Sequence, residues 1–256
     1  MNAISKPRRR ERLARILLLV LLPLSLLLTV GLRAFVVQAY KTPSGSMYPT
    51  LEAGDHLFVA MSAYGVFEKT MPPRGDVLTF DFPESLEVGH QVFVKRVIGL
   101  PGDTLLVEGG HPTINGWRVP SCLVGRVTVE HTPGSRTELE LFVEFLDGAA
   151  YVVAVDPLLS HGREGPFVVP KGEVYVLGDN RMNSSDSRVW HGGRGGGVPL
   201  GLVGGRGFVV WWPRLASLRG TPKLPAIAPP PDAALDACLA KRPPLERTRP
   251  PAPKPG

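Results

Sequence analysis

The hydrophobic positions of the chain form one long N-terminal run, followed by many short runs. The long run begins at Ile16 and contains no charged residue before Arg33, which is followed by the apolar stretch AFVV. A membrane-spanning helix needs about 20 apolar residues, and the run reaches this length if Arg33 extends its charged end toward the interface. Pro23 lies inside the run, where a membrane helix tolerates a kink. The pattern therefore predicts a transmembrane anchor over residues 16–37.

The short runs are rich in β-branched and aromatic residues and end at turn residues. Such runs are typical of strands bounded by turns. The clearest are QVFVKRVIG, ELELFVEF, AYVVAV, EVYVLGD and GFVVWWP. The stretch TINGWRVP carries an Asn-Gly pair and predicts a hairpin. We therefore expect the part of the chain after the anchor to be mostly β.

Composition agrees with this picture and sets the C-terminal part of the chain apart. The chain has 256 residues, of which 43% are hydrophobic, and its 29 Gly and 27 Pro favour turns over long helices. From about residue 215 onward, Pro, Ala and charged residues dominate. A segment of this kind is not expected to bury a core. We expect residues 215–256 to form a Pro-rich, disordered tail.

The net charge of +6 gathers at the two ends of the chain. No basic stripe crosses the central part, which argues against a nucleic-acid partner. Arginines precede the apolar run, so the positive-inside rule places residues 1–15 in the cytoplasm and the remainder on the other side. The alternative is a cleavable signal peptide ending at Ala39, but the apolar run exceeds the usual length of about 7–15 residues. In either case the body of the protein is extracytoplasmic.

The two cysteines, Cys122 and Cys238, lie far apart along the chain. Neither belongs to a spacing that indicates a metal site. We interpret Cys122 as a free buried thiol and Cys238 as a thiol of the tail, which leaves the redox compartment open. No metal or organic cofactor is expected.

Candidate chemistry begins in the loop KTPSGSMYPTLEAGDHLFV, which contains Ser44 and Ser46. Serine is a weak nucleophile unless a base activates it. The usual nucleophile elbow, GxSxG followed by a helix, is absent because Pro49 interrupts the stretch. Most of the histidines stand beside Gly, Pro or Asp, as surface residues often do, and they are His56, His90, His111, His131, His161 and His191. A Ser-His-Asp triad stays open, because its order varies between folds.

A lysine is the other candidate base, since burial lowers its pKa and leaves it neutral. Lys95 lies within the apolar run QVFVKRVIG. Strand alternation would place Phe93, Lys95 and Val97 on one face. The alternative is a solvent-facing lysine on an edge strand, and periodicity alone slightly favours it.

Three blocks then occur in order after the apolar N-terminal run: PSGSMYPTLEAGD, VKRVIGLPGD and GDNRMNSSDSRVW. Together with GDHLFV, they resemble the type I signal peptidase family, which consists of membrane-anchored serine endopeptidases with a Ser/Lys dyad. The resemblance spans Tyr40 to about Pro213. It implies an N-terminal transmembrane helix followed by an antiparallel β-sheet catalytic domain, residues 38–103 and 173–214, with an inserted variable β-domain, residues 104–172.

The resemblance also implies roles for individual residues. Ser46 matches the nucleophile and Lys95 the general base. The Ser44 hydroxyl, with the backbone N–H of Ser46, matches the oxyanion hole. Ser184 matches the serine that orients the lysine, and Asp186 and Arg188 match a supporting ion pair. The neighbouring Asp179, Asn180 and Arg181 are expected to hold the loop. Positions that match substrate-binding residues are Tyr40, Thr42, Met47, Leu51, Phe93 and Val94.

The function that the resemblance implies is removal of signal peptides from exported preproteins, after small residues in an Ala-x-Ala pattern. The expected partners are these signal peptides and the lipid bilayer, and the expected state is a single-pass monomer of the plasma (inner) membrane. Two alternatives remain. One is a non-catalytic relative that binds exported peptides, and the other is a secreted Ser-His hydrolase.

Overall fold

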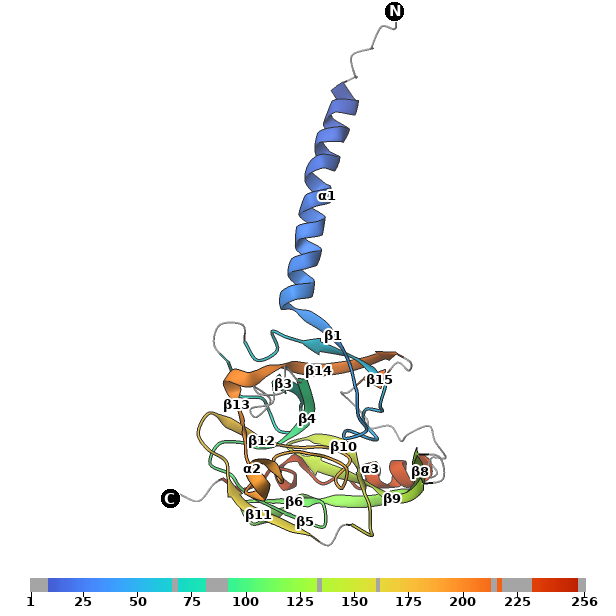
Figure 1. Ribbon diagram of the computed structural model, residues 1–256, viewed down its shortest axis with the longest axis vertical. Coiled ribbons are helices and arrows are strands. Elements are labelled where there is room, and N and C mark those ends of the chain that lie inside the picture. The colour runs from blue at the N-terminus through green and yellow to red at the C-terminus, as the bar shows by residue number, and fades with distance from the viewer. Residues whose placement is uncertain are drawn as a thin grey trace, which may run out of the picture.

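A single long helix leads into a β-rich body in the computed structural model of the protein (Figure 1). The helix, α1, covers Arg9–Phe35 and contains Pro23. The structure describes residues 9–65, 69–81, 92–132, 135–159, 162–212, 216–217 and 232–252. Strand β1, Val37–Lys41, begins directly after the helix, so α1 ends slightly before the predicted boundary at residue 37.

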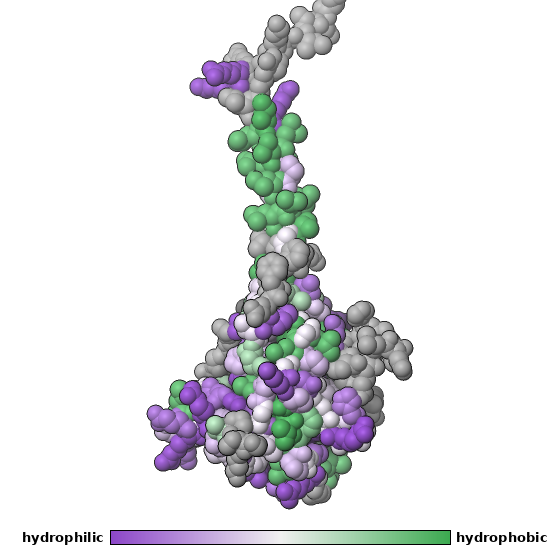
Figure 2. Space-filling view, turned by 90° about the vertical axis from the view of Figure 1, so that its left-hand side faces the viewer, coloured by the Kyte–Doolittle hydropathy of each residue, from purple (hydrophilic) through white to green (hydrophobic). Residues whose placement is uncertain are grey.

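The apolar side chains of α1 are not covered by the rest of the protein. Between Ala14 and Gly31 the helix is long and apolar enough to cross a membrane, and none of this window is buried against the body. Figure 2 shows the helix as a hydrophobic stalk above a body of mixed polarity. An uncovered apolar surface of this extent requires an apolar environment outside the protein. The length and composition of α1 are therefore those of a membrane anchor.

The largest sheet contains strand β4, which carries Lys95, and strands β2 and β12, which border the other sequence blocks. Its order is β1-β2-β14-β3-β4-β12-β13, and β15 pairs with β14; all of its pairings are antiparallel. Besides β1, the strands are β2 (His56–Ala60), β3 (Val77–Asp81), β4 (Val92–Gly99), β12 (Glu173–Leu177), β13 (Val198–Pro199), β14 (Val203–Trp212) and β15 (Ala216–Ser217). Two short helical turns accompany it, α2 (Trp190–Gly193) and η2 (Leu200–Leu202).

The predicted insertion, residues 104–172, supplies both smaller sheets. One has the order β10-β9-β8 and the other β11-β5-β6-β7. Their strands are β5 (Thr104–Glu108), β6 (His111–Ile114), β7 (Trp117–Arg118), β8 (Ser121–Thr132), β9 (Ser135–Leu146), β10 (Ala149–Val155) and β11 (Arg163–Val168). These sheets share an apolar core with the main sheet, because Ile98 of β4 and Tyr175 of β12 pack in one cluster with Leu105 of β5.

The predicted Asn-Gly hairpin is confirmed. Ile114 pairs with Trp117 across the turn. Asn115 and Gly116 both have positive φ, 55° and 81°. Two positive values in succession define the turn type that Asn-Gly favours, because its twist matches that of the flanking strands.

The prediction of a disordered tail is wrong for residues 232–252. Asp232–Ala240 form helix α3, and Leu245–Arg247 form a 3-10 turn, η3. Helix α3 packs on β8. The composition of the whole tail concealed the short stretch DAALDACLA, in which apolar residues recur at helical spacing. Residues 218–231 of the predicted tail lie outside the described residues.

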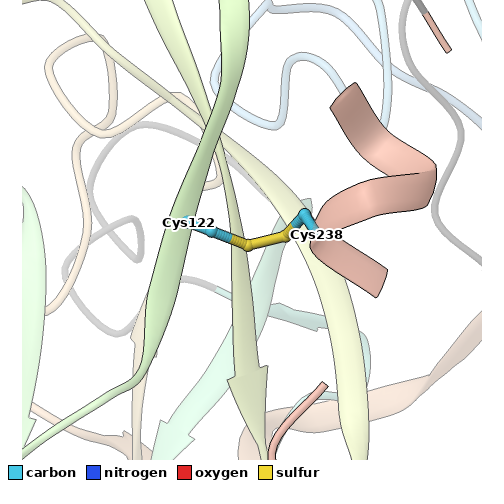
Figure 3. Close-up of a disulfide and its surroundings, with 2 residues drawn as sticks. All are labelled: Cys122 and Cys238. Carbon is cyan, nitrogen blue, oxygen red and sulfur yellow. A yellow bond between two sulfur atoms is a disulfide. The ribbon is translucent and has the colours of Figure 1, made fainter. Parts of the chain in front are cut away.

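The interpretation of the cysteines as free thiols is also wrong. Cys122 of β8 and Cys238 of α3 form a disulfide (Figure 3). Their separation of 116 residues gave no local signal for this pairing, which depends on how α3 docks.

Candidate active site

A cleft of about 590 Å³ lies between the serine loop and strand β4. The predicted residues that line it are Thr42, Ser44, Ser46, Met47, Phe93, Val94 and Lys95. Asn183 and Ser185 also line it, although sequence reasoning did not single them out. Blocks that are distant in the sequence therefore meet at one concave surface.

Lys95 points its amine at Ser46 inside this cleft. Lys95 Nζ lies 2.8 Å from Ser46 Oγ, and it also donates to the Val94 carbonyl at 3.1 Å. The amine lies 5.6 Å from the centre of the Phe93 ring. Lys95 is only 3% exposed, so the alternative of a solvent-facing lysine is wrong. Strand β4 loses its alternation after Val94 because both of its faces are covered there.

Burial also changes the acidity of this amine. The loss of hydration disfavours the charged form and lowers the pKa of Lys95 to about 8. The negative charges of Asp186 and Asp179 act in the opposite direction, and Arg188 adds to the lowering. At pH 7 about a tenth of the molecules therefore carry the neutral amine, and the neutral form can accept a proton.

Ser44 lies on the exposed side of the nucleophile loop. Its hydroxyl donates to Ser46 Oγ at 3.2 Å. This hydrogen bond brings the Ser44 hydroxyl next to the Ser46 hydroxyl. Between the two serines, Gly45 is not among the residues of positive φ, and a Cβ built on it would meet nothing within 4 Å. The loop conformation itself therefore does not require glycine there.

The backbone of the serine loop is fixed by the block that follows β12. The N–H of Asn180 donates to the Ser46 carbonyl at 3.1 Å, and its side-chain amide donates to the Gly45 carbonyl at 3.1 Å. Asn180 is itself buried. These two hydrogen bonds keep the serine loop next to the loop after β12.

Asp179 and Arg96 form a buried ion pair. Arg96 donates through Nε and Nη2 to the two carboxylate oxygens at 2.8 and 2.6 Å. The Thr50 hydroxyl also donates to Asp179, and Arg96 Nη1 donates to the Gly75 carbonyl at 2.7 Å. Bidentate pairs of this kind fix geometry as well as charge. Arg96 follows Lys95 directly, so the pair also holds β4 in position.

The predicted pair of Asp186 and Arg188 is present. Arg188 donates to the two carboxylate oxygens at 2.8 and 2.9 Å, and the Gly178 N–H donates to Asp186 at 2.9 Å. Arg188 also donates to the Arg181 carbonyl at 2.5 Å. Asp186 is fully buried, and its charge has the largest opposing influence on the pKa of Lys95.

Ser184 does not make the hydrogen bond to Lys95 that the resemblance implied. Its hydroxyl oxygen is buried and has no hydrogen-bond partner among the described residues. The side chain lies directly against Gly178, and a Cβ built on Gly178 would also come within 2.5 Å of the Ser46 carbonyl oxygen. Ser184, Gly178 and Ser46 are therefore packed without space between them.

Glu144 is a member of this network that sequence reasoning missed. Arg181 donates to its two carboxylate oxygens at 2.8 and 2.6 Å, and both side chains are completely buried. His111 lies 3.3 Å from the same carboxylate. Burial alone would raise the pKa of Glu144, but the charge of Arg181 and the hydrogen bonds from His111 and Arg181 lower it to about 2. One signal was present in the sequence. In the stretch ELELFVEF, glutamate alternates with apolar residues until Phe142, which stands where the alternation predicts a polar residue. This break indicates that both faces of β9 are covered there.

Two predicted substrate-binding residues lie elsewhere. Leu51 is completely buried in the core cluster that includes Leu57 and Val59. Tyr40 packs against the same cluster, and its hydroxyl donates to Gln38 at 2.6 Å. Met47 belongs both to this core and to the cleft wall.

No histidine lines the cleft in the described part of the chain. The His56 ring packs edge-on against Trp211 at 5.3 Å, and His111 is engaged with Glu144. His90 and His161 lie outside the described residues. Among the described residues, the amine of Lys95 is the group that contacts the Ser46 hydroxyl.

The chain is similar to known proteins over most of its length. Residues 13–212 match the family model described as signal peptidase, peptidase S26. A signal peptidase I of Pseudomonas aeruginosa is 34% identical over 211 residues, which cover 73% of this chain and 70% of the relative. A signal peptidase I of Leptolyngbya laminosa is 35% identical over 205 residues, covering 78% and 81%.

A crystal structure of a signal peptidase I from Enterococcus faecalis is also similar, at 23% identity and a TM-score of 0.29. It covers 54% of this chain and 97% of that one, and the likeness is too slight to bear on the fold. The family match and the identities carry the assignment: the chain belongs to the signal peptidase family of serine peptidases, S26.

Proposed function

We propose that the protein is a membrane-bound endopeptidase that removes N-terminal signal peptides from exported preproteins, with Ser46 as nucleophile and Lys95 as general base. The observation that carries this proposal is the 2.8 Å contact between Lys95 Nζ and Ser46 Oγ within the cleft. A general base must lie within hydrogen-bond reach of the proton it removes, and this distance supports that role for Lys95. The lowered pKa of Lys95, about 8, supplies its neutral form.

The chemistry follows from these positions. Neutral Lys95 accepts the hydroxyl proton of Ser46 while the oxygen attacks the scissile carbonyl carbon. The negative charge that develops on the carbonyl oxygen is stabilised by the Ser46 N–H and the Ser44 hydroxyl. One such donor contributes roughly 10²–10³ in rate. The lysine then gives its proton to the leaving amine, which leaves an acyl-enzyme. A water molecule then attacks the ester carbonyl and loses a proton to Lys95, which returns that proton to Ser46 Oγ as the carbon–oxygen bond breaks, so both residues are restored.

The walls of the cleft support a preference for small side chains at the cleavage site. Met47, Phe93 and Val94 bring apolar surface close to the dyad. Bulky walls leave room for alanine and exclude larger residues by steric clash, which suits an Ala-x-Ala pattern. The start of β4, at Val92, is exposed and lines the cleft, so an extended substrate can add to it by backbone pairing.

The anchor and the disulfide support an extracytoplasmic body. Arginines at the start of α1 favour a cytoplasmic N-terminus. The Cys122–Cys238 disulfide fits an oxidising compartment, where such bonds persist. Trp211 and Trp212 are exposed on β14, which pairs with β2, and β2 pairs with the β1 strand that follows the anchor. Exposed tryptophans are enriched at membrane interfaces.

The test is cleavage of a preprotein with an Ala-x-Ala site by the full chain in detergent. Wild type is compared with Ser46→Ala, Lys95→Ala, His56→Ala and His191→Ala, each checked for folding. We expect the first two variants to be inactive and the histidine variants to match wild type. Near-full activity of Lys95→Ala would move the base elsewhere. Loss in a histidine variant would favour the Ser-His hydrolase, and a wild type that binds but never cuts would favour the peptide-binding alternative.

A further inference from the structure

The C-terminal helix α3 is attached covalently and by packing to the sheet of β8, β9 and β10. Figure 3 shows the disulfide that joins Cys122 of β8 to Cys238 of α3, with 6.2 Å between their Cα atoms. Leu235 and Cys238 are 6% and 5% exposed, so the helix buries one apolar side. Leu239 packs against the same cluster. Helix α3 itself lies beyond residue 212, where the family match ends.

The cluster that α3 completes also contains a residue of the nucleophile loop. Tyr48 stands two positions after Ser46, is 6% exposed, and belongs to the same cluster as Leu235 and Cys238. The members between them come from the three strands, and they are Val124, Val127, Leu139, Leu141, Val143, Phe145, Val152 and Ala154. Close-packed interiors transmit displacement, because few voids absorb it. A displacement of α3 is therefore expected to displace Tyr48 and with it the loop that carries Ser46.

A second attachment holds the segment that follows α3. The Thr248 carbonyl accepts the N–H of Asp147 at 2.8 Å, and its hydroxyl accepts the N–H of Gly148 at 3.2 Å. Asn115 donates to the Pro251 carbonyl at 2.7 Å. Thr248 is completely buried. The segment is therefore fixed at the turn between β9 and β10 as well as at β8.

We propose that residues 232–252 are a positioning element for catalysis, made effective by the oxidation of Cys122 and Cys238. The disulfide keeps α3 on the apolar cluster, the cluster holds Tyr48, and Tyr48 keeps Ser46 at its distance from Lys95. The two thiols lose two protons and two electrons to a disulfide oxidant, which becomes a dithiol. The proposal rests on the proposed function, and it makes full activity conditional on arrival in an oxidising compartment.

The variants separate positioning from stability. Cys122→Ala with Cys238→Ala removes the bond, and Leu235→Ser weakens the packing while leaving the bond in place. Asp236→Ser is the control, because Asp236 is exposed on the same helix. Cleavage is measured on the full chain in detergent, well below the melting temperature of each variant, and is expressed per folded molecule.

We expect kcat to fall about tenfold in Leu235→Ser and in the double cysteine variant, since small misplacements of reacting groups lower the rate strongly. KM and the apparent pKa of the rate profile should stay at the wild-type values, and Leu235→Met should restore kcat. Reduction with a dithiol should lower kcat of wild type and not of the double cysteine variant, and reoxidation should reverse the loss. Folded variants that keep the wild-type kcat but have a lower melting temperature would overturn the proposal, because residues 232–252 would then contribute to stability and not to catalysis.

Hydrogen exchange at the amides of residues 44–51 supplies a readout that needs no activity. Exchange in this loop should increase in Leu235→Ser and in the double cysteine variant, and not in Asp236→Ser. Unchanged loop exchange would refute the positioning role even if the wild type cut no preprotein. A wild type that cuts no preprotein would count against the proposed function alone.

Discussion

Lys95 and Ser46, 49 residues apart in the sequence, meet with 2.8 Å between the amine nitrogen and the hydroxyl oxygen. The contact is made in a buried environment, with Lys95 only 3% exposed. Burial lowers the pKa of Lys95, and the negative charges of Asp186 and Asp179 limit how far it falls. If Ser46 is the nucleophile and Lys95 the base, as proposed, this arrangement has measurable consequences.

The pH dependence of cleavage should report the amine. With a Lys95 pKa of about 8, we expect kcat/KM to rise with pH through an apparent pKa near 8 and then level off. The rise occurs because only the neutral amine accepts the serine proton. A rise centred near 6.5 would instead indicate a histidine base. Stopped-time assays of a preprotein between pH 5.5 and 10, on the full chain in detergent, decide between the two.

Lys95 should also be costly for stability at neutral pH. Its folded pKa, about 8, lies below the ordinary lysine value of 10.5, so between these values the unfolded chain holds a proton that the folded chain has lost. The free energy of unfolding of wild type therefore rises with pH through this window, by about 3 kcal/mol. Lys95→Met lacks this term, so its advantage over wild type should be largest at pH 7 and should shrink toward pH 10.

Denaturant unfolding of both proteins at pH 7 and pH 10 tests this. The matched control is Lys41→Met, which removes a lysine whose side chain is exposed. A difference between wild type and Lys95→Met that is constant across the window would contradict the lowered pKa.

Gly178 should be required for catalysis because of its packing. Its backbone is not in the left-handed region, so alanine can adopt the same conformation. The added Cβ would lie 2.5 Å from both the Ser184 Cβ and the Ser46 carbonyl oxygen, which forces the nucleophile loop to move. We expect Gly178→Ala to lower kcat by about 10²-fold, as a displacement of the order of 1 Å does.

Gly201→Ala serves as the comparison, because a Cβ there meets nothing within 4 Å. Its kcat should equal that of wild type. Steady-state cleavage of one preprotein by the three proteins is the measurement, and wild-type kcat in Gly178→Ala would show that the loop accommodates the methyl group.

Much of this site could be predicted because its chemistry is local in the sequence. The serine loop, Lys95 and the Asp186–Arg188 pair stand in compact blocks, and the hairpin at Asn115 follows from two adjacent residues. The burial of Lys95 could not be derived from alternation. Strand β4 is covered on both faces beyond Val94, and periodicity carries no signal in such a strand.

The features that were missed depend on contacts between distant segments. The Cys122–Cys238 disulfide joins residues 116 apart, and it forms because α3 docks on β8. Composition averaged over the tail hid this helix. Leu51 was assigned to the substrate pocket from its place in a motif, yet the turn after Ser46 directs it into the core. A motif shows that a residue lies near the site along the chain, but the direction of its side chain depends on the fold.

Glu144 gives the sharpest test of how the insertion supports the active site. It is the buried partner of Arg181, whose carbonyl accepts a hydrogen bond from Arg188 of the pair beside Lys95. Glu144→Gln preserves shape but leaves the Arg181 charge uncompensated, which should lower the free energy of unfolding by about 3–5 kcal/mol at pH 7. Glu140→Gln on the same strand is the control. Its partner Arg126 is 60% exposed, and such pairs contribute about 0–1 kcal/mol.

The pH dependence of this loss has a definite sign. The folded pKa of Glu144, about 2, is below the ordinary glutamate value of 4.5, so its stabilisation is present above pH 4.5 and disappears as pH falls toward 2. The gap between wild type and Glu144→Gln should therefore be full at pH 7 and narrow at pH 3. Urea unfolding at both values measures it. An equal gap at the two pH values would mean that the Glu144 carboxylate is not stabilised by Arg181, and that the loss comes from packing alone.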